Sequence, residues 1–199
     1  DADLIVDHSF CVTSSCGGPV AFSVLVNDGN GTVSEESVAR GLDFRGVNVV
    51  GVVSGDLDGD GDFDLVIERG MGGTPGLTVA LNDGSGNFTR REYNSWPVSG
   101  SGFSQSGALG DVDGDGDLDL IVGRGPTDLG QPGSLVAGPY PGGHATVVHL
   151  LALNDGNGNF TDVSRTHFDA GGRSELLVGP NIAVADIDLD GDLDLLSGM

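Results

Sequence analysis

The sequence has no lysine, and its 8 basic residues are all arginine, against 30 acidic residues in a chain of 199. A nucleic-acid interface needs clustered positive charge, so this balance argues against nucleic-acid partners and offers no basic patch to an anionic membrane surface. No apolar run approaches the roughly 20 residues that a membrane-spanning helix requires. Because the chain starts inside a repeat, we expect any targeting segment to lie upstream of this sequence.

Sequence signatures of catalysis are also absent. The chain shows no Ser-His-Asp or Cys-His arrangement and no phosphate-binding loop, so we expect a protein that is not an enzyme. The adhesion tripeptide Arg-Gly-Asp does not occur either. The only cysteines are Cys11 and Cys16. They predict a small disulfide-closed loop in an oxidising compartment, with two buried free thiols as the alternative.

The acidity is concentrated in one repeated loop. The stretch Gly55-Asp-Leu-Asp-Gly-Asp-Gly-Asp-Phe-Asp-Leu-Val-Ile67 returns with small changes at Gly110 and at Ala185. Each copy has aspartate at relative positions 1, 3, 5, 7 and 9 and glycine at position 6, followed by an apolar run. The first residues of the chain are expected to be the tail of a fourth copy. Most of the formal net charge of −22 is therefore local to these loops.

Oxygen-bearing side chains at alternate positions of a tight loop are the donor pattern that Ca²⁺ prefers, since this ion takes about 6 to 8 oxygen ligands. We expect one ion in each complete loop, held by the carboxylates at positions 1, 3, 5 and 9 and by the carbonyl at position 7. Glycine at position 6 fits a sharp turn with positive φ. The loops contain no His or Cys, which argues against zinc. Mg²⁺ is less favoured than Ca²⁺, because it prefers to keep several waters rather than take all of its ligands from the protein. The predicted metal-binding residues are Asp56, Asp58, Asp60, Asp62, Asp64, Asp111, Asp113, Asp115, Asp117, Asp119, Asp186, Asp188, Asp190, Asp192 and Asp194, with Asp1 and Asp3 of the partial copy.

Two other interpretations of the loops are possible: they are acidic, solvated turns, or neighbouring aspartates act as general acid and base. Against the first, two like charges about 4 Å apart repel by roughly 4 kcal/mol at an effective dielectric near 20, so close carboxylates without a cation would be strained. Against the second, the same loop occurs in every repeat, whereas a catalytic pair is expected once.

A second motif alternates with the loops. Apolar residues followed by Asn-Asp-Gly occur around Asp28, Asp83 and Asp155, and Asp-Gly between apolar runs is a strong hairpin signal. We interpret these three aspartates as turn residues only. Each repeat then contains four short strands, which for the second unit are predicted at 47–54, 64–68, 77–82 and 87–93. Sustained helical periodicity is absent, so we predict an all-β protein, with at most one helical turn at 33–41.

These motifs resemble the FG-GAP/VCBS repeat family, which includes the calcium-binding β-propeller of integrin α chains. The resemblance rests on Asp-x-Asp-x-Asp-Gly-Asp-x-Asp-Leu followed by Leu-Asn-Asp-Gly-x-Gly-x-Phe, and it covers essentially the whole chain. It implies about three four-stranded blades, fewer than the four to eight that close a ring, so we expect a segment of a larger, about seven-bladed propeller. The expected divisions are a partial blade at 1–43, blades at 44–98 and 99–172, and a partial blade at 173–199.

The third loop departs from the family pattern at one position, because Leu189 replaces the glycine at position 4. Its ligand positions are intact, so we expect it to bind a cation. The resemblance also implies that partners bind on the face opposite the metal loops, where a Pro/Gly-rich insertion at 123–147 lies. Loops on rigid scaffolds often carry function, although this one is equally interpreted as an excursion packed on its own blade. The candidate contacts are Arg124, Tyr140 and His144.

The chain has glycosylation sequons at Asn30, Asn87 and Asn159, of which turn preference explains the last two at least as well. Taken together, the sequence predicts a calcium-binding repeat module of a secreted or cell-surface protein, with Ca²⁺ in a structural role. Its expected partners are proteins, glycans or neighbouring subunits of an extracellular assembly. The alternative is an accessory or catalytic propeller of a polysaccharide-degrading enzyme such as a lyase, and fold alone does not choose between them.

Overall fold

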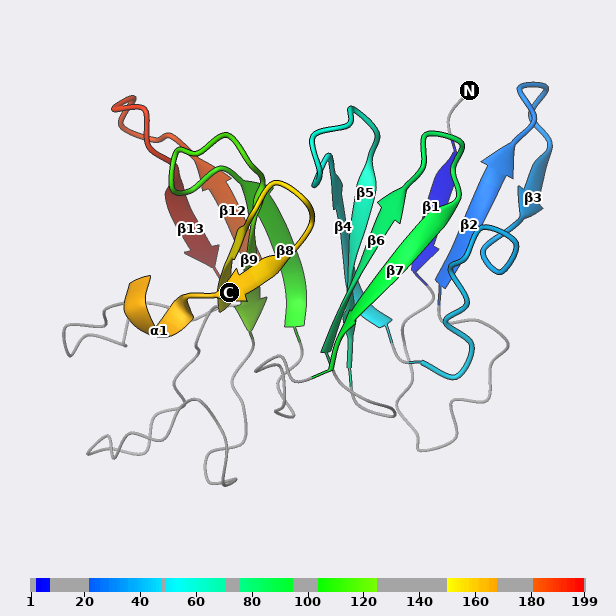
Figure 1. Ribbon diagram of the computed structural model, residues 1–199, viewed down its shortest axis with the longest axis horizontal. Coiled ribbons are helices and arrows are strands. Elements are labelled where there is room, and N and C mark those ends of the chain that lie inside the picture. Colours follow the sequence, from blue (N-terminus) through cyan, green and yellow to red (C-terminus); the bar gives the residue numbers. More distant parts are fainter. Residues whose placement is uncertain are drawn as a thin grey trace.

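A computed structural model describes residues 3–7, 22–47, 49–70, 76–94, 104–124, 150–167 and 181–198. The strands of this part of the chain form antiparallel sheets that stand side by side (Figure 1). The first sheet contains β1 (Leu4–Asp7), β2 (Phe22–Asn27) and β3 (Val33–Glu35). The second contains β4 (Val49–Gly55), β5 (Asp64–Arg69), β6 (Gly76–Asn82) and β7 (Phe88–Tyr93). The third contains β8 (Ser104–Gly110), β9 (Asp119–Arg124), β10 (Leu150–Asn154) and β11 (Phe160–Asp162), and the fourth contains β12 (Asn181–Ala185) and β13 (Asp194–Gly198).

Within each sheet the strands follow their order along the chain, and the first strands of successive sheets lie against one another. β1 contacts β4, β4 contacts β8, and β8 contacts β12. This is the arrangement of consecutive propeller blades, whose first strands line the central axis. The predicted fold class is therefore confirmed, and the four strands expected in the second unit are present, with ends that differ by one or two residues.

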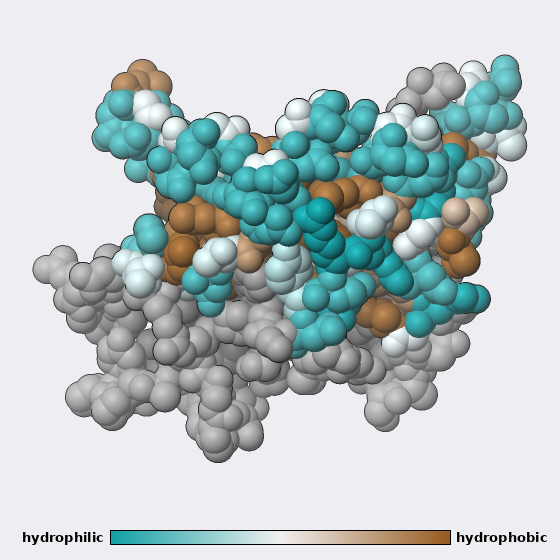
Figure 2. Space-filling model, viewed as in Figure 1, coloured by the Kyte–Doolittle hydropathy of each residue, from teal (hydrophilic) through white to brown (hydrophobic). Residues whose placement is uncertain are grey.

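The connections divide between two edges of the sheets. Because neighbouring strands are antiparallel, the Asp-rich loops that follow β4, β8 and β12 lie at the same edge as the hairpins β2–β3, β6–β7 and β10–β11. This is the upper edge in Figure 1. Figure 2 shows that hydrophilic residues cover most of this edge. The links from β5 to β6 and from β9 to β10 leave from the opposite edge.

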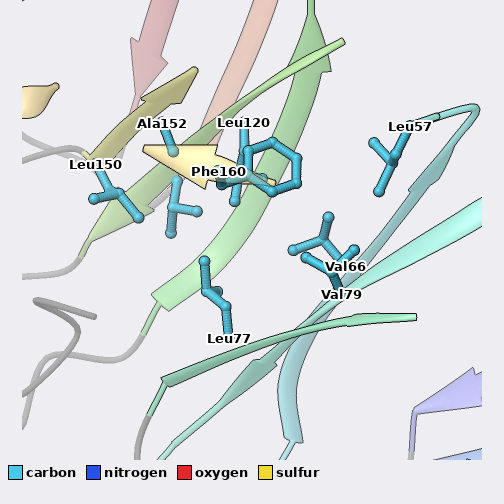
Figure 3. Close-up of a cluster of buried hydrophobic side chains, with 9 residues drawn as sticks. Leu57, Val66, Leu77, Val79, Leu120, Leu150, Ala152 and Phe160 are labelled. Carbon is cyan, nitrogen blue, oxygen red and sulfur yellow. The ribbon is translucent and has the colours of Figure 1, made fainter. Parts of the chain in front are cut away.

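Apolar side chains fill the spaces between adjacent sheets. Between the second and third sheets, Leu57, Val66, Leu120, Leu150 and Phe160 belong to one buried cluster (Figure 3). A second cluster joins the first and second sheets and takes fully buried side chains from the connection before β4, Leu42 and Phe44. Since burying one Leu or Phe side chain contributes about 1.5–3 kcal/mol, these clusters fix how each blade packs on the next.

The outer strands are of two kinds. β7 has 6 residues, whereas β3 and β11 have 3 each. Beyond the end of each short strand, a buried serine accepts a main-chain hydrogen bond from the neighbouring strand. Ser37 Oγ accepts the N–H of Val24 at 2.8 Å, and Ser164 Oγ accepts that of Leu151 at 2.9 Å. Each serine satisfies a backbone donor that a longer strand would otherwise pair.

Each of these serines lies at the start of a single helical turn. Arg40 N–H donates to the carbonyl of Glu36 at 3.0 Å, in the region where one turn was expected. The second turn is α1 (Ser164–His167), which the all-β prediction did not include. No helix in the described part of the chain is long and apolar enough to cross a membrane.

Candidate metal centres

The Asp-rich loops are loop 1 (residues 56–64), loop 2 (residues 111–119) and loop 3 (residues 186–194). Each loop folds around the carboxylate of its first residue. Asp56 accepts the N–H of Gly59 at 2.8 Å and that of Gly61 at 3.0 Å. Asp111 and Asp186 accept the corresponding bond from the glycine at position 6, at 3.0 and 3.1 Å. The first aspartate therefore sets the loop conformation as well as offering oxygens.

The backbone at position 6 has the conformation that the sequence predicted. Gly61, Gly116 and Gly191 have φ of 92°, 98° and 101°, a region that glycine adopts without steric cost. At position 5, Asp60 accepts the N–H of Asp62 at 2.9 Å, and the other two loops repeat this bond at 3.0 Å. The loops share one local geometry because they share these residues.

These turns bring carboxylates together. One oxygen from each member of a triplet lies within 4.8 Å of the others, and the triplets are Asp56, Asp58 and Asp64; Asp111, Asp113 and Asp115; and Asp186, Asp188 and Asp194. All of these side chains come from positions 1, 3, 5 and 9, the positions expected to supply carboxylates. The assignment of individual ligands, including the carbonyl at position 7, stays a prediction.

The aspartate at position 9 is the most enclosed. Asp64 is fully buried, and it accepts the N–H of Leu57 on Oδ2 at 2.8 Å and that of Asn82 on Oδ1 at 2.7 Å. Asp119 is also fully buried and accepts the equivalent two bonds, both at 2.9 Å. Burial raises the pKa of both carboxyl groups, and neighbouring loop carboxylates raise it further while the amide bonds oppose the shift. A cation beside them would offset this cost.

The same contact identifies the partial fourth loop. Asp3 accepts the N–H of Asn27 at 2.9 Å, as Asp64 does that of Asn82. Asp3 therefore occupies position 9, which agrees with the sequence interpretation of this segment. Asp1 lies outside the described residues.

An unpaired oxygen in loop 1 provides a test of whether the donor set fits a metal. Oδ1 of Asp58 is buried and has no hydrogen-bond partner. A buried carboxylate oxygen without a partner is costly. A cation among Asp56, Asp58 and Asp64 would satisfy it, and an all-oxygen donor set suits a hard ion such as Ca²⁺. The residues of loop 1 thus fit a bound calcium ion.

Comparison with models of known protein families agrees with the resemblance found in the sequence. The model of the FG-GAP-like repeat matches residues 71–122 and 135–197, and the model of the FG-GAP repeat matches residues 103–148. The chain belongs to the FG-GAP-like repeat family. FG-GAP repeats are blades of β-propellers, often bind Ca²⁺, and are typical of extracellular or cell-surface proteins. No curated protein matches the sequence.

In these FG-GAP repeats the asparagine of the hairpin turn forms hydrogen bonds with the Asp-rich loop, a contact that the sequence interpretation missed. Besides their N–H bonds to position 9, Asn82 Nδ2 donates to the carbonyl of Phe63 at 3.3 Å and Asn154 Nδ2 to that of Leu118 at 3.2 Å. The N–H bond to position 9 spans 18 residues in one blade and 35 in the other. The recurrence of Asn-Asp-Gly after the partial first copy and after loops 1 and 2, despite different spacing, was the available signal.

The hairpin glycine also contacts the loop. A Cβ added to Gly84 would lie 2.6 Å from Oδ2 of Asp62, and one added to Gly156 would lie 2.5 Å from Oδ2 of Asp117. The side chain at position 7 therefore rests on the hairpin turn. Desolvation and the carboxylates around it raise the pKa of Asp117. The hairpin thus supports positions 7, 8 and 9 of its own loop.

The hairpin aspartates behave as turn residues. Asp83 accepts the N–H of Ser85 at 2.9 Å and that of Asn87 at 3.2 Å, and Asp28 makes the equivalent bonds to Asn30 and Thr32. Main-chain and side-chain hydrogen bonds lower the pKa of all three, Asp155 included.

The three sequons differ in how freely their amides are presented. Asn87 Nδ2 donates to Asp83 at 3.1 Å. Asn159 Nδ2 donates to Asp155 at 3.0 Å, and its Oδ1 accepts a bond from Arg91 at 2.8 Å. Asn30 Nδ2 makes a longer contact of 3.4 Å with the carbonyl of Asp28. Glycosylation at these sites stays a prediction.

The remaining predicted residues lie at the edge of the described structure or outside it. Arg124 is the last residue of β9, at the edge opposite the loops. Tyr140 and His144, together with Cys11 and Cys16, fall outside the described residues, so the disulfide and these two contacts stay predictions.

Proposed function

We propose that this FG-GAP segment is a calcium-stabilised binding module of a secreted or cell-surface protein, in which Ca²⁺ has a structural role. The observation that carries the proposal is the buried, unpartnered Oδ1 of Asp58 within a cluster of three carboxylates. A cluster of three loop carboxylates, always including positions 1 and 3, recurs in each of the three loops and supports one ion per loop.

The hydrogen bonds that the loop carboxylates accept support a structural role for the ion. Asp64 is the first residue of β5, and its carboxylate accepts the N–H of Leu57, two residues after β4 ends, and that of Asn82, the last residue of β6. An ion bound to Asp64 would therefore fix the ends of three strands at once. Because only the folded loop assembles these ligands, ion binding adds to the stability of the folded protein by mass action.

Binding rather than catalysis is the proposed activity. The clustered carboxylates recur in every loop and accept main-chain hydrogen bonds, as expected for a structural element. We place the partner, a protein, a glycan or a neighbouring subunit, on the edge opposite the loops, where Arg124 ends β9. Support for this placement is the sequence alone, which puts the long insertion of residues 123–147 there.

The test is thermal unfolding of the chain with millimolar Ca²⁺, with millimolar Mg²⁺ and with chelator, together with the stoichiometry of bound metal. At a Ca²⁺ concentration about 100 times Kd, each occupied site adds about 2.7 kcal/mol. We expect a large calcium-specific rise in Tm and one ion per complete loop. Asp58→Asn should remove one ion, whereas Asp43→Asn, away from the loops, should leave the stoichiometry unchanged. An equal response to Mg²⁺, or none to either ion, would refute the structural-calcium proposal.

A further inference from the structure

Loops 1 and 2 belong to adjacent blades and are joined by hydrogen bonds through residues that are not predicted ligands. Leu57 of loop 1 donates its N–H to Asp64 at 2.8 Å, and its carbonyl accepts a bond from Asn154 Nδ2, also at 2.8 Å. Asn154 donates its main-chain N–H to Asp119 of loop 2 at 2.9 Å, and its Nδ2 also donates to the carbonyl of Leu118 at 3.2 Å. The bonds thus run without a break from one candidate site to the other.

The two connecting residues are held tightly. Leu57 is 1% exposed, and Figure 3 shows it within the apolar cluster that contains Val66 and Phe160. Asn154 is buried between the same two sheets. The N–H of Gly158, four residues further along the hairpin, also donates to the carbonyl of Leu57 at 3.0 Å. Since close-packed interiors transmit displacement, ordering of Leu57 restricts Asn154.

We infer that Leu57 and Asn154 couple the two sites, so that Ca²⁺ in loop 1 raises the affinity of loop 2 for Ca²⁺. The inference rests on the calcium binding proposed above. An ion in loop 1 immobilises Asp64 and, with it, the Leu57 peptide group. The fixed carbonyl holds Asn154, whose N–H groups position Leu118 and Asp119, so less ordering remains for the second ion to impose. Linkage requires that loop 2 raises the affinity of loop 1 by the same factor.

Among the described residues there is a matched asparagine that lacks this connection. Asn82 occupies the same hairpin position in the preceding blade, and its Nδ2 donates to Phe63 of its own loop. Its Oδ1 accepts the N–H of Gly86 from its own hairpin at 2.9 Å. Asn154 Oδ1 has no hydrogen-bond partner, because the equivalent N–H, that of Gly158, donates to Leu57 instead. Within the part of the chain that the structure describes, Asn154 therefore contacts two of the Asp-rich loops, and Asn82 contacts one.

The sign of the effect separates this coupling from direct electrostatics. Losing Ca²⁺ from loop 1 removes two positive charges, while Asp58→Asn removes one negative charge. Loop 1 is then more negative by one unit than when it holds an ion. Through space, this charge favours a cation in loop 2, an effect that salt screens. The hydrogen-bonded connection predicts the opposite, a weaker loop 2.

The experiment is an NMR titration of the 199-residue chain with Ca²⁺ at about 0.15 M salt. The amide groups of Gly61 and Gly116 donate to the first aspartates of loops 1 and 2, so their shifts report each site separately. Asp58→Asn should weaken binding at loop 2 by about fivefold, the lower end of usual allosteric coupling. In an Asn154→Leu background the same substitution should have less than about half of that effect. In an Asn82→Leu background the fivefold effect should persist.

Each outcome has a distinct meaning. If Asp58→Asn leaves loop 2 unchanged or strengthens it, or if Asn154→Leu keeps the full effect, the coupling is refuted while calcium binding stands. If neither glycine amide responds to Ca²⁺ in the unmodified chain, the proposed function itself fails. Should either Leu variant not fold, Asn154→Ala and Asn82→Ala supply the same matched pair.

Discussion

Loops 1 and 3 have similar sequences and share three internal hydrogen bonds, yet they differ in what covers them. The residue at position 2 is Leu57 in loop 1, which is 1% exposed, and Ile187 in loop 3, which is 58% exposed. The position-9 carboxylate is buried in loop 1 and exposed in loop 3. Loop 1 is covered by the third sheet, through Asn154 and Gly158. In the described ranges no strand follows β13, so loop 3 lacks the cover that the third sheet gives to loop 1. The sequence of a repeat thus sets the loop geometry, and a following sheet sets how far the loop is shielded from water.

The largest expected difference concerns position 2. Leu57→Ala removes a side chain from the core between two sheets and should lower the free energy of unfolding by about 3 kcal/mol. Ile187→Ala, at the exposed equivalent position, should cost less than about 1 kcal/mol. Denaturant unfolding in chelator measures both without a contribution from the metal. Equal costs would mean that cover by the adjacent sheet does not distinguish these loops.

Position 9 gives the next largest difference. Asp64→Ala leaves the N–H groups of Leu57 and Asn82 without their acceptor in a buried region, which should cost about 2 kcal/mol. Asp194→Ala should cost less than about 1 kcal/mol, because the N–H of Ile187 lies in an exposed loop that water can reach. The same unfolding experiment applies, and a larger cost at Asp194 than at Asp64 would contradict the comparison.

At position 4, by contrast, a substitution in loop 3 is expected to raise the stability of the folded chain. Leu189 has φ of 63° and is 85% exposed, whereas its equivalents Gly59 and Gly114 have φ of 76° and 77°. The side chain has room, since a Cβ added to either glycine meets nothing within 4 Å. Leu189→Gly should therefore raise stability by about 1 kcal/mol through relief of backbone strain, and Gly59→Leu should lower it by a similar amount. Unchanged melting temperatures for both variants would show that no strain is stored at this position.

The smallest expected effect is a pH-dependent change in Tm at an ion pair outside the loops, which serves as a control. Arg45 lowers the pKa of Asp43 to about 2, from the ordinary value of 3.8. A lowered carboxyl pKa stabilises the folded state above the unfolded pKa, and this contribution disappears as the pH falls from about 4 to about 2. Both side chains are exposed, so the gain is small. The difference in Tm between the unmodified chain and Asp43→Asn should be constant above pH 4 and vanish near pH 2. A Tm difference that persists at pH 2 would show that the Asp43–Arg45 ion pair is not its cause.

Much of this architecture follows from the sequence. Strand positions, hairpins and the convergence of carboxylates at positions 1, 3, 5 and 9 follow from alternation, Asp-Gly turns and spacing, because these are local properties. The supporting contacts are not local: the bond from Asn154 to Leu57 joins residues 97 apart. The sequence interpretation missed Ser37 and Ser164 for the same reason. Each side chain accepts a main-chain N–H from a strand residue 13 positions earlier in the chain.

The most direct test is the Ca²⁺ affinity of each loop, read from the amide resonances of Gly61 and Gly191 in one NMR titration. Both amides donate to the first aspartate of their own loop, at 3.0 and 3.1 Å. Charges interact more strongly where water is excluded, so loop 1 should saturate at a Ca²⁺ concentration about tenfold lower than loop 3. Saturation of loop 3 first, or no response at Gly61, would contradict the prediction that cover by the adjacent sheet strengthens the proposed calcium binding at loop 1.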